Sequence, residues 1–110
     1  MCIFCDIANK PGMSTMIYED ENVVAFNDIH PVAPVHVLIV PRKHVDNIYS
    51  LEDEKCLGSV LKAIKEVAKK QGVSESGFRV VTNCGENAGQ TVPHLHFHLI
   101  GGKKLGENLY

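Results

Sequence analysis

Three histidines in one short segment are the residues of this chain best suited to chemistry. Residues 93–102 read PHLHFHLIGG, so His94, His96 and His98 occupy alternate positions and apolar residues fill the gaps. Side chains alternate between the two faces of a β-strand, so the spacing predicts three imidazoles on one face, with successive rings roughly 7 Å apart. The opposite face is apolar and suits a protein core. On a helix the same residues would be spread around the axis.

Three kinds of site fit such a row of imidazoles. The histidines can form a solvated or hydrogen-bonded face, although rings this close repel one another once protonated. They can bind a catalytic zinc ion, which also needs a means of activating water; Glu86 is the nearest carboxylate. A neutral imidazole can also attack phosphorus and form a covalent intermediate, while its neighbours bind phosphate oxygens. The pattern alone leaves the zinc and phosphorus interpretations equally open.

The loop at 84–92 delivers the chain into the histidine segment. Gly89 offers a backbone N–H and lets the main chain approach a phosphate closely. Gln90 and Thr91 add amide and hydroxyl donors. Under the phosphorus interpretation, this loop is the predicted phosphate-binding segment.

Five strands and one long helix are predicted to position these residues. The run at 36–41 is continuously apolar, which indicates burial on both faces. The segment 5–9 is compatible with one further helical turn. Strands that are mostly adjacent in sequence indicate an α+β fold with an antiparallel sheet. The predicted strands are 16–20, 23–28, 36–41, 77–83 and the histidine segment starting at Pro93, and the predicted helix is 51–71.

The predicted helix carries its own end signals and an apolar stripe. Ser50 is the expected N-cap, with Asp53 placed as in a capping box. Gly72 can adopt the left-handed conformation that ends a helix, and the lysines before it favour the negative end of the helix dipole. The stripe consists of Leu57, Val60, Leu61, Ile64, Val67 and Ala68.

Composition predicts one domain spanning 1–110. The chain has 110 residues, 45% of them hydrophobic, which is enough for a core. The net charge of −2 and the scattered basic residues do not favour a nucleic-acid partner. No apolar run approaches the length of a membrane span, and no secretory signal is visible, so we expect a cytoplasmic protein.

The histidine segment resembles the signature of the histidine triad (HIT) family. That signature is His-φ-His-φ-His-φ-φ, with φ hydrophobic, and residues 94–100 fit it in full. The similarity continues through most of the chain in family order, in the segments 2–7, 25–29, 36–44 and 81–102. It implies a HIT-like fold and a homodimer, with the long helix and a strand edge at the interface. It also favours the phosphorus interpretation.

Gly101-Gly102 resembles the nucleoside phosphoramidase branch, because members that cleave dinucleoside polyphosphates tend to have Pro-Arg at these positions. The resemblance therefore implies a hydrolase that cleaves the P–N bond of purine nucleoside 5′-phosphoramidates, such as AMP joined to an amine. One alternative is a dinucleoside polyphosphate hydrolase or a nucleotidyl transferase. Another is a non-enzymatic nucleotide-binding or interaction module, although a pure binder has no need of a nucleophile.

The resemblance assigns catalytic roles to four histidines. His96, the middle histidine, would be the nucleophile that forms a nucleotidyl-histidine intermediate. His98 would contact the phosphate oxygens and assist proton transfer. The backbone carbonyl of His94 would fix the tautomer of His96, and His36 would support the pocket.

The nucleotide-binding residues are also implied by the family match. Asp28 would accept hydrogen bonds from the ribose hydroxyls. Four apolar residues would surround the base, although each taken alone is better interpreted as a core residue: Phe4, Ile7, Phe26 and Ile29. The residues implied to line the phosphate are Asn83, Gly89, Gln90 and Thr91.

Cys2-x-x-Cys5 supplies half of a tetrahedral zinc site. The alternatives are a redox pair, which normally follows a strand, and two reduced thiols near a terminus. Some triad proteins with this pair resemble a pattern that here adds His44 and His94. That pattern implies a structural Zn²⁺, not needed for catalysis, which pins the N-terminus beside the triad. The remaining cysteines, Cys56 and Cys84, are expected to be small buried hydrophobes.

Overall fold

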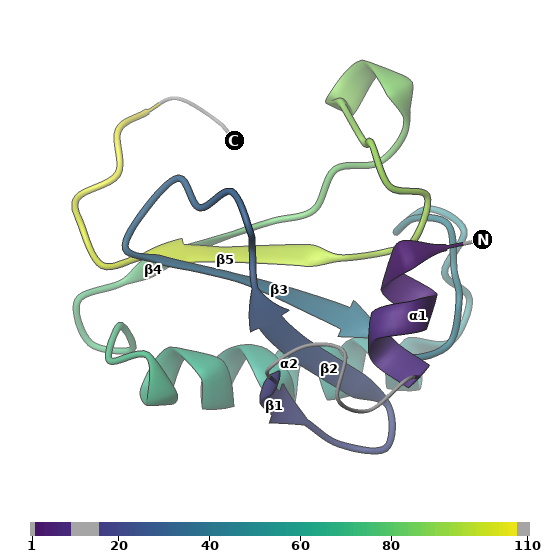
Figure 1. The fold of residues 1–110 in the computed structure, drawn as a ribbon, viewed down its shortest axis with the longest axis horizontal. Helices are drawn as coiled ribbons and strands as arrows, with labels where there is room; N and C mark the ends of the chain where they lie inside the picture. The colour runs from purple at the N-terminus through teal and green to yellow at the C-terminus, as the bar shows by residue number, and fades with distance from the viewer. Residues whose placement is uncertain (1, 10–15, 108–110) are drawn as a thin grey trace.

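The computed structural model describes residues 2–9 and 16–107. Its five-stranded sheet is antiparallel throughout, with the strand order β1-β2-β3-β5-β4. This confirms the predicted α+β architecture with one long helix, and α2 runs along one side of the sheet (Figure 1). The elements are α1 (Ile3–Asn9), β1 (Met16–Glu19), β2 (Val23–Asn27), β3 (Val35–Pro41), α2 (Glu54–Lys70), β4 (Phe78–Val81), the 3₁₀ turn η1 (Glu86–Ala88) and β5 (Phe97–Gly101).

Strand β3 lies at the centre of the sheet, between β2 and β5, and all seven of its residues are buried. Its side chains pack into two hydrophobic clusters, one on each face of the sheet. Val37 and Ile39 pack with α2 on one face, whereas Leu38 and Val40 pack with α1 on the other. The predicted burial of 36–41 on both faces is therefore confirmed, and the reason is that a helix covers each face.

Helix α2 begins later than the sequence suggested. Asp53 is the N-cap, and its carboxylate accepts a hydrogen bond from the Lys55 N–H at 2.9 Å. The prediction of Ser50 as the cap is wrong, because Ser50 belongs to a preceding turn in which its own N–H donates to the Asn47 side chain. The end of the helix is as predicted, with Gly72 in the left-handed conformation (φ 74°).

The apolar stripe of α2 divides into two faces. Val60, Val67 and Ala68 are buried in the core against the sheet. Leu57 and Leu61 point outward, and Leu61 is 53% exposed. The helix therefore keeps an apolar surface that the sheet does not cover.

The histidine strand is shorter than predicted. Strand β5 begins at Phe97, so His94 and His96 precede it. Two hydrogen bonds explain the difference: the His94 N–H donates to the Val92 carbonyl in a tight turn, and the Leu95 N–H donates to the Val45 carbonyl. The alternation nevertheless persists, because Leu95, Phe97 and Leu99 are all buried in the core beside α2.

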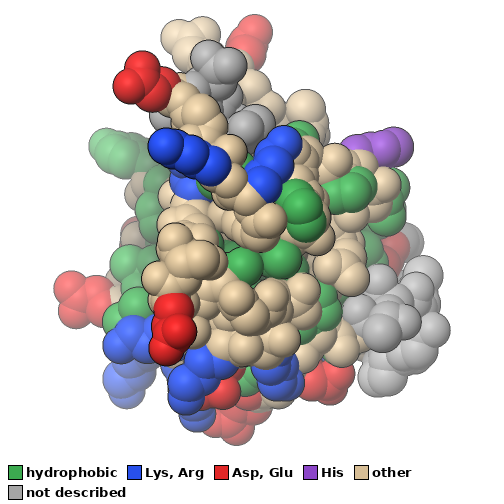
Figure 2. Space-filling view, turned by 90° about the vertical axis from the view of Figure 1, so that its left-hand side faces the viewer, with side chains coloured by type: hydrophobic (Ala, Val, Ile, Leu, Met, Phe, Trp, Pro, Cys, Tyr) green, Lys and Arg blue, Asp and Glu red, His purple; other side chains and the backbone are tan. Residues whose placement is uncertain are grey.

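Within the described residues, no helix is long and apolar enough to cross a membrane. On the face shown in Figure 2, basic and acidic side chains are interspersed with apolar ones.

Candidate active site

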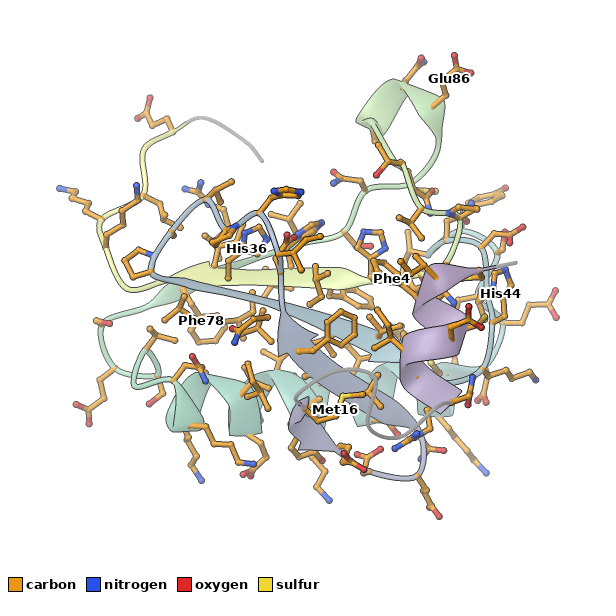
Figure 3. All side chains as sticks on the ribbon, viewed as in Figure 1. Phe4, Met16, His36, His44, Phe78 and Glu86 are labelled. Atoms are coloured by element: carbon orange, nitrogen blue, oxygen red, sulfur yellow. The ribbon has the colours of Figure 1, made fainter. Side chains whose placement is uncertain are left out.

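The histidines gather on the sheet face opposite α2, at the junction of β3, β5 and α1. His36 and His98 come from the neighbouring strands β3 and β5, and His36 points away from α2 (Figure 3). His96 precedes β5, and its ring centroid lies 5.1 Å from that of His98. The Thr82 hydroxyl donates to the His96 carbonyl at 2.7 Å and so fixes the backbone of this residue.

A backbone carbonyl sets the tautomer of His96. Nδ1 of His96 lies 2.7 Å from the His94 carbonyl oxygen. A carbonyl can only accept, so Nδ1 carries the proton of the neutral ring and Nε2 keeps its lone pair. This is the arrangement that a nucleophilic imidazole requires.

A second chain of contacts sets the tautomer of His98. The Val32 N–H donates to Nδ1 of His36 at 3.1 Å, so the proton of neutral His36 is on Nε2. That nitrogen lies 2.9 Å from Nδ1 of His98, which must then accept. The remaining Nε2–H of His98 is left as a donor, as binding a phosphoryl oxygen requires.

Burial keeps the imidazoles of His36 and His98 neutral. Desolvation is the main cause that lowers the pKa of His36, and the carboxylate of Asp28 opposes it. Desolvation, followed by repulsion from His96 and His36, lowers the pKa of His98 to about 4. The predicted repulsion between neighbouring rings is therefore present and acts on His98.

Asp28 lies beside the hydrogen-bonded pair of His36 and His98. Its Oδ2 is 3.4 Å from Nε2 of His36 and 4.0 Å from Nδ1 of His98. Its other oxygen accepts a hydrogen bond from the His30 N–H. These three side chains could by position hold a cation. The proton that Val32 forces onto Nε2 of His36 opposes this and favours a hydrogen-bonded chain.

The second cluster has the donor chemistry of a metal site. Cys2, Cys5, His44 and His94 place their ligand atoms within 4.8 Å of one another. The sulfur–Nδ1 distances are 3.3 Å for Cys2–His94, 3.1 Å for Cys5–His44 and 3.3 Å for Cys5–His94. Tetrahedral zinc with Zn–S about 2.3 Å and Zn–N about 2.0 Å would need separations of about 3.6 Å, a movement of a few tenths of an ångström.

The outer nitrogens of this cluster favour metal binding. Nε2 of His94 lies 2.8 Å from the Pro41 carbonyl, and Nε2 of His44 lies 2.9 Å from the Asp46 carboxylate. Both acceptors place the proton on Nε2, so both Nδ1 lone pairs face the thiols. Desolvation, together with the neighbouring Cys2, raises the pKa of Cys5, and a divalent cation would reverse that effect. The residues therefore fit a four-ligand structural zinc site.

The three triad imidazoles do not share one ligand point. His94 faces the two thiols, His96 faces a carbonyl and His98 faces His36. Glu86, the carboxylate considered for water activation, lies at the tip of the η1 loop and points away from the sheet (Figure 3). This geometry favours the phosphorus interpretation over a zinc ion bound by the triad.

The residues expected around the base lie on the α1 side of the sheet. Phe4 and Phe26 are buried there with their ring centroids 5.9 Å apart, and Ile7 packs against the same cluster. Ile29 is instead 85% exposed, in the segment after Asp28. It is available to a ligand but is not part of the core.

In the loop 84–92, predicted to bind phosphate, some of the expected donors already form hydrogen bonds with the protein. The Gly89 N–H donates to the Glu86 carbonyl. The Gln90 side chain accepts from the Gly85 N–H and donates to the Asp46 and Val92 carbonyls. Asn83 is half-buried and Thr91 is exposed. Gln90 therefore braces the loop against the segment that carries His44.

Several groups that orient the site histidines could not be identified from the sequence. The Val32 N–H, the Pro41 carbonyl and the Thr82 hydroxyl act through the register of elements that are distant in the chain. Asp46 was detectable in principle, because it lies two residues after His44. Cys56 and Cys84 are half-buried rather than fully buried as expected.

Two glycines close the strand beside the site. A side chain at Gly101 would meet Phe78 and Val73 at 3.3 Å. Gly102 has a φ of 87°, and a Cβ there would lie 3.1 Å from Pro34. Both glycines thus have a steric reason in this fold.

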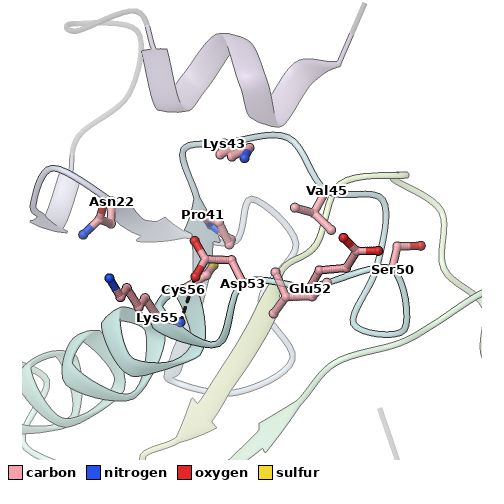
Figure 4. A pocket seen from close by; sticks show the side chains of 10 residues that line it. Asn22, Pro41, Lys43, Val45, Ser50, Glu52, Asp53, Lys55 and Cys56 are labelled. Atoms are coloured by element: carbon pink, nitrogen blue, oxygen red, sulfur yellow. Dashed lines mark hydrogen bonds between the residues drawn. The ribbon is translucent and has the colours of Figure 1, made fainter.

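A cavity of about 630 Å³ lies away from the histidines, between the N-terminus of α2 and the segment after β3 (Figure 4). None of the predicted site residues lines it. Its lining residues are Asn22, Pro41, Lys43, Val45, Ser50, Leu51, Glu52, Asp53, Lys55 and Cys56. The chemistry of the histidine face, not the size of this cavity, identifies the candidate active site.

Comparisons with known proteins agree with this geometry. The purine nucleoside phosphoramidase of Escherichia coli strain K12 is 38% identical over 109 residues, which are 97% of this chain and 92% of that protein. Protein HitA of Neisseria gonorrhoeae is 40% identical over 102 residues, or 91% of this chain and 94% of that protein.

Solved structures give the same result. A HIT family hydrolase from Clostridium thermocellum has a TM-score of 0.92 and 46% identity, covering 99% of this chain and 96% of that one. A histidine triad protein from Clostridium difficile has the same TM-score and identity, covering 98% and 96%. The HIT domain matches residues 10–105. The triad geometry, the fold and these matches together place the chain in the HIT family.

Proposed function

We propose that this protein is a nucleotide-binding hydrolase that cleaves the P–N bond of purine nucleoside 5′-phosphoramidates. The observation that carries the proposal is the His96 imidazole, whose Nδ1 is held by the His94 carbonyl while Nε2 keeps its lone pair. The similarity to a purine nucleoside phosphoramidase supports the choice of substrate.

The proposed reaction has two steps. Nε2 of His96 attacks the α-phosphorus, the P–N bond breaks, and the amine leaves with one added proton. Water then attacks the phosphorus and returns a proton to His98, the bond to His96 breaks, and the nucleoside monophosphate leaves. Nε2–H of His98 stabilises the charge on the phosphoryl oxygens in both steps. The anionic phosphate raises the pKa that desolvation lowers in free His98, so this ring can also pass a proton to the amine.

The nucleoside would bind on the α1 side of the sheet. Asp28 would accept hydrogen bonds from the ribose hydroxyls, and the exposed Ile29 supports contact with the base. The base pocket would be formed by Phe4, Ile7, Phe26 and Ile29, and the phosphate site by His96, His98, Asn83, Gly89, Gln90 and Thr91. Because the Gly89 N–H and the Gln90 side chain already form hydrogen bonds, within the loop and to Asp46, their contribution would be mainly to the shape of the loop.

The same proposal includes a homodimer. Leu57 and Leu61 form an outward apolar surface on α2. Val80, on the edge strand β4, is 39% exposed. A second copy that covers both surfaces would remove this apolar area from water.

We also propose a structural Zn²⁺ held by Cys2, Cys5, His44 and His94, with no role in the chemical steps. Titration with Co²⁺ should give the visible bands of tetrahedral thiolate coordination at one equivalent per chain. Cys5→Ser should abolish those bands, and Cys56→Ser, which alters a thiol outside the cluster, should retain them. Bands that survive in Cys5→Ser would refute the ligand set. Reduced thiols at such a site suit the cytoplasm.

A trapping experiment tests the enzymatic proposal. Brief exposure to adenosine 5′-phosphoramidate should add one adenylyl group, and peptide mass spectrometry should locate it on His96. His96→Ala should show neither adduct nor turnover. A matched assay with a diadenosine polyphosphate should give much slower turnover. Faster cleavage of the polyphosphate would reassign the substrate, and equal turnover by His96→Ala would remove His96 from the mechanism.

A further inference from the structure

Phe4 contacts the candidate nucleophile directly. Its ring centroid lies 4.9 Å from that of His96, with an interplanar angle of 78°, which is an edge-to-face contact. The same ring meets Phe26 at 5.9 Å and His94 at 6.1 Å. Phe4 is buried, so it forms a fixed wall beside the His96 imidazole rather than a mobile surface group.

The helix that carries Phe4 is short. Helix α1 has seven residues, too few to be stable in water without tertiary contacts. Its C-terminal end is held by Arg42, whose guanidinium donates to the Ala8 carbonyl. At its N-terminal end, Cys2 and Cys5 lie on either side of Phe4 in the sequence, and both thiols face imidazoles of the body of the protein.

His94 connects the two sites through different atoms. Its Nδ1 faces the thiols of Cys2 and Cys5, and its backbone carbonyl holds Nδ1 of His96. The carbonyl contact fixes the tautomer of His96. The tilt of the imidazole about that hydrogen bond is left to the groups that pack against the ring, and Phe4 is one of them.

We propose that Phe4 is a positioning residue for His96 and that a cation bound by Cys2, Cys5, His44 and His94 holds it in place. This inference rests on the proposed function of His96. With the cation bound, the first turn of α1 is tied to His44 and His94, and Phe4 stays against the imidazole. Without it, the first turn detaches, the wall is lost, and the nucleophile samples unproductive orientations.

Four variants separate this role from a wall of the base pocket: Phe4→Leu, Cys5→Ser, the double variant, and Ile3→Ala as control. Ile3 lies on the same helix, is 59% exposed and belongs to neither site. Phe4→Leu, which keeps an apolar side chain beside the base, should retain one Zn²⁺ and lower the maximal single-turnover rate of adenylylation about tenfold, with the half-saturating substrate concentration little changed. Cys5→Ser should lose the metal and show an adenylylation rate similar to that of Phe4→Leu. The double variant should be no slower than Cys5→Ser, because both changes remove one interaction.

Two readouts require no turnover. The ¹⁵N chemical shifts of the His96 imidazole, measured without nucleotide, should move in Phe4→Leu and on removal of Zn²⁺ from wild-type protein by a chelator, but not in Ile3→Ala. Chelation should also speed amide hydrogen exchange in α1. Unchanged His96 signals in Phe4→Leu, or losses that multiply in the double variant, would overturn the inference. Failure of the wild type to form an adduct would instead overturn the proposed function.

Discussion

Acid pH should destabilise this protein through His98. Its pKa is lowered from 6.5 to about 4 in the folded state, mainly by desolvation. Between these values the unfolded chain binds a proton that the folded chain does not, so stability falls as pH falls. The contribution of neutral His98 to the free energy of unfolding is fully present at pH values well above 6.5. About 2 kcal/mol of it should be lost by pH 5 and about 3 kcal/mol by pH 4.

A matched variant isolates this effect. His98→Gln keeps a polar side chain of similar length but cannot titrate. Urea unfolding of both proteins, followed by circular dichroism from pH 7.5 to pH 4, gives their difference in unfolding free energy at each pH. Groups that titrate in this range without contacting His98, including the metal cluster, contribute to both proteins and cancel to first order.

The unfolding free energy of wild type should fall relative to that of His98→Gln as the pH falls. The reason is that only wild type buries a neutral imidazole that is protonated in the unfolded chain. Parallel curves for the two proteins would show that His98 titrates near its ordinary pKa. The desolvation argument, and with it the neutral donor assigned to His98, would then be refuted. A direct NMR titration of the His98 ring provides an independent check.

Three further changes test other parts of the structure. Asp53→Ala should cost about 1 kcal/mol in urea unfolding, whereas Ser50→Ala should cost little, because only Asp53 caps α2. Leu61→Lys should convert the proposed dimer into a monomer in sedimentation velocity, and an unchanged sedimentation coefficient would count against the α2 interface. Val32→Pro removes the N–H that orients His36 and should lower turnover about tenfold. Val32→Ala, which keeps that N–H, controls for loss of the side chain.

The patterns with a strong period were predictable from the sequence. Alternation in the histidine segment correctly placed Leu95, Phe97 and Leu99 in the core. The apolar run of β3 correctly indicated burial on both faces. These features depend on side-chain chemistry repeated over several residues, which is the information that a single sequence carries best.

Features decided by one local hydrogen bond were not predictable. Ser50 and Asp53 are both good N-caps, and the turn that uses the Ser50 N–H decides between them. The shortened start of β5 follows from the pairing of Leu95 with Val45, across fifty residues of chain. No local pattern reports such a pairing.

The candidate site divides in the same way. The structure brings Cys2, Cys5, His44 and His94 together as the family resemblance implied. The tautomers of His36 and His98, in contrast, depend on the Val32 N–H. A main-chain donor has no residue type, so sequence reasoning could not identify it.

The Gly101-Gly102 turn has a consequence for the neighbouring loop. A Cβ at position 102 would lie 3.1 Å from the Pro34 Cβ, so the loop that leads from Asp28 to β3 would have to yield by a few tenths of an ångström. The position of this loop therefore depends on the absence of a side chain at a neighbouring turn. Bulkier residues at this turn would shift the loop that carries Asp28 and Ile29.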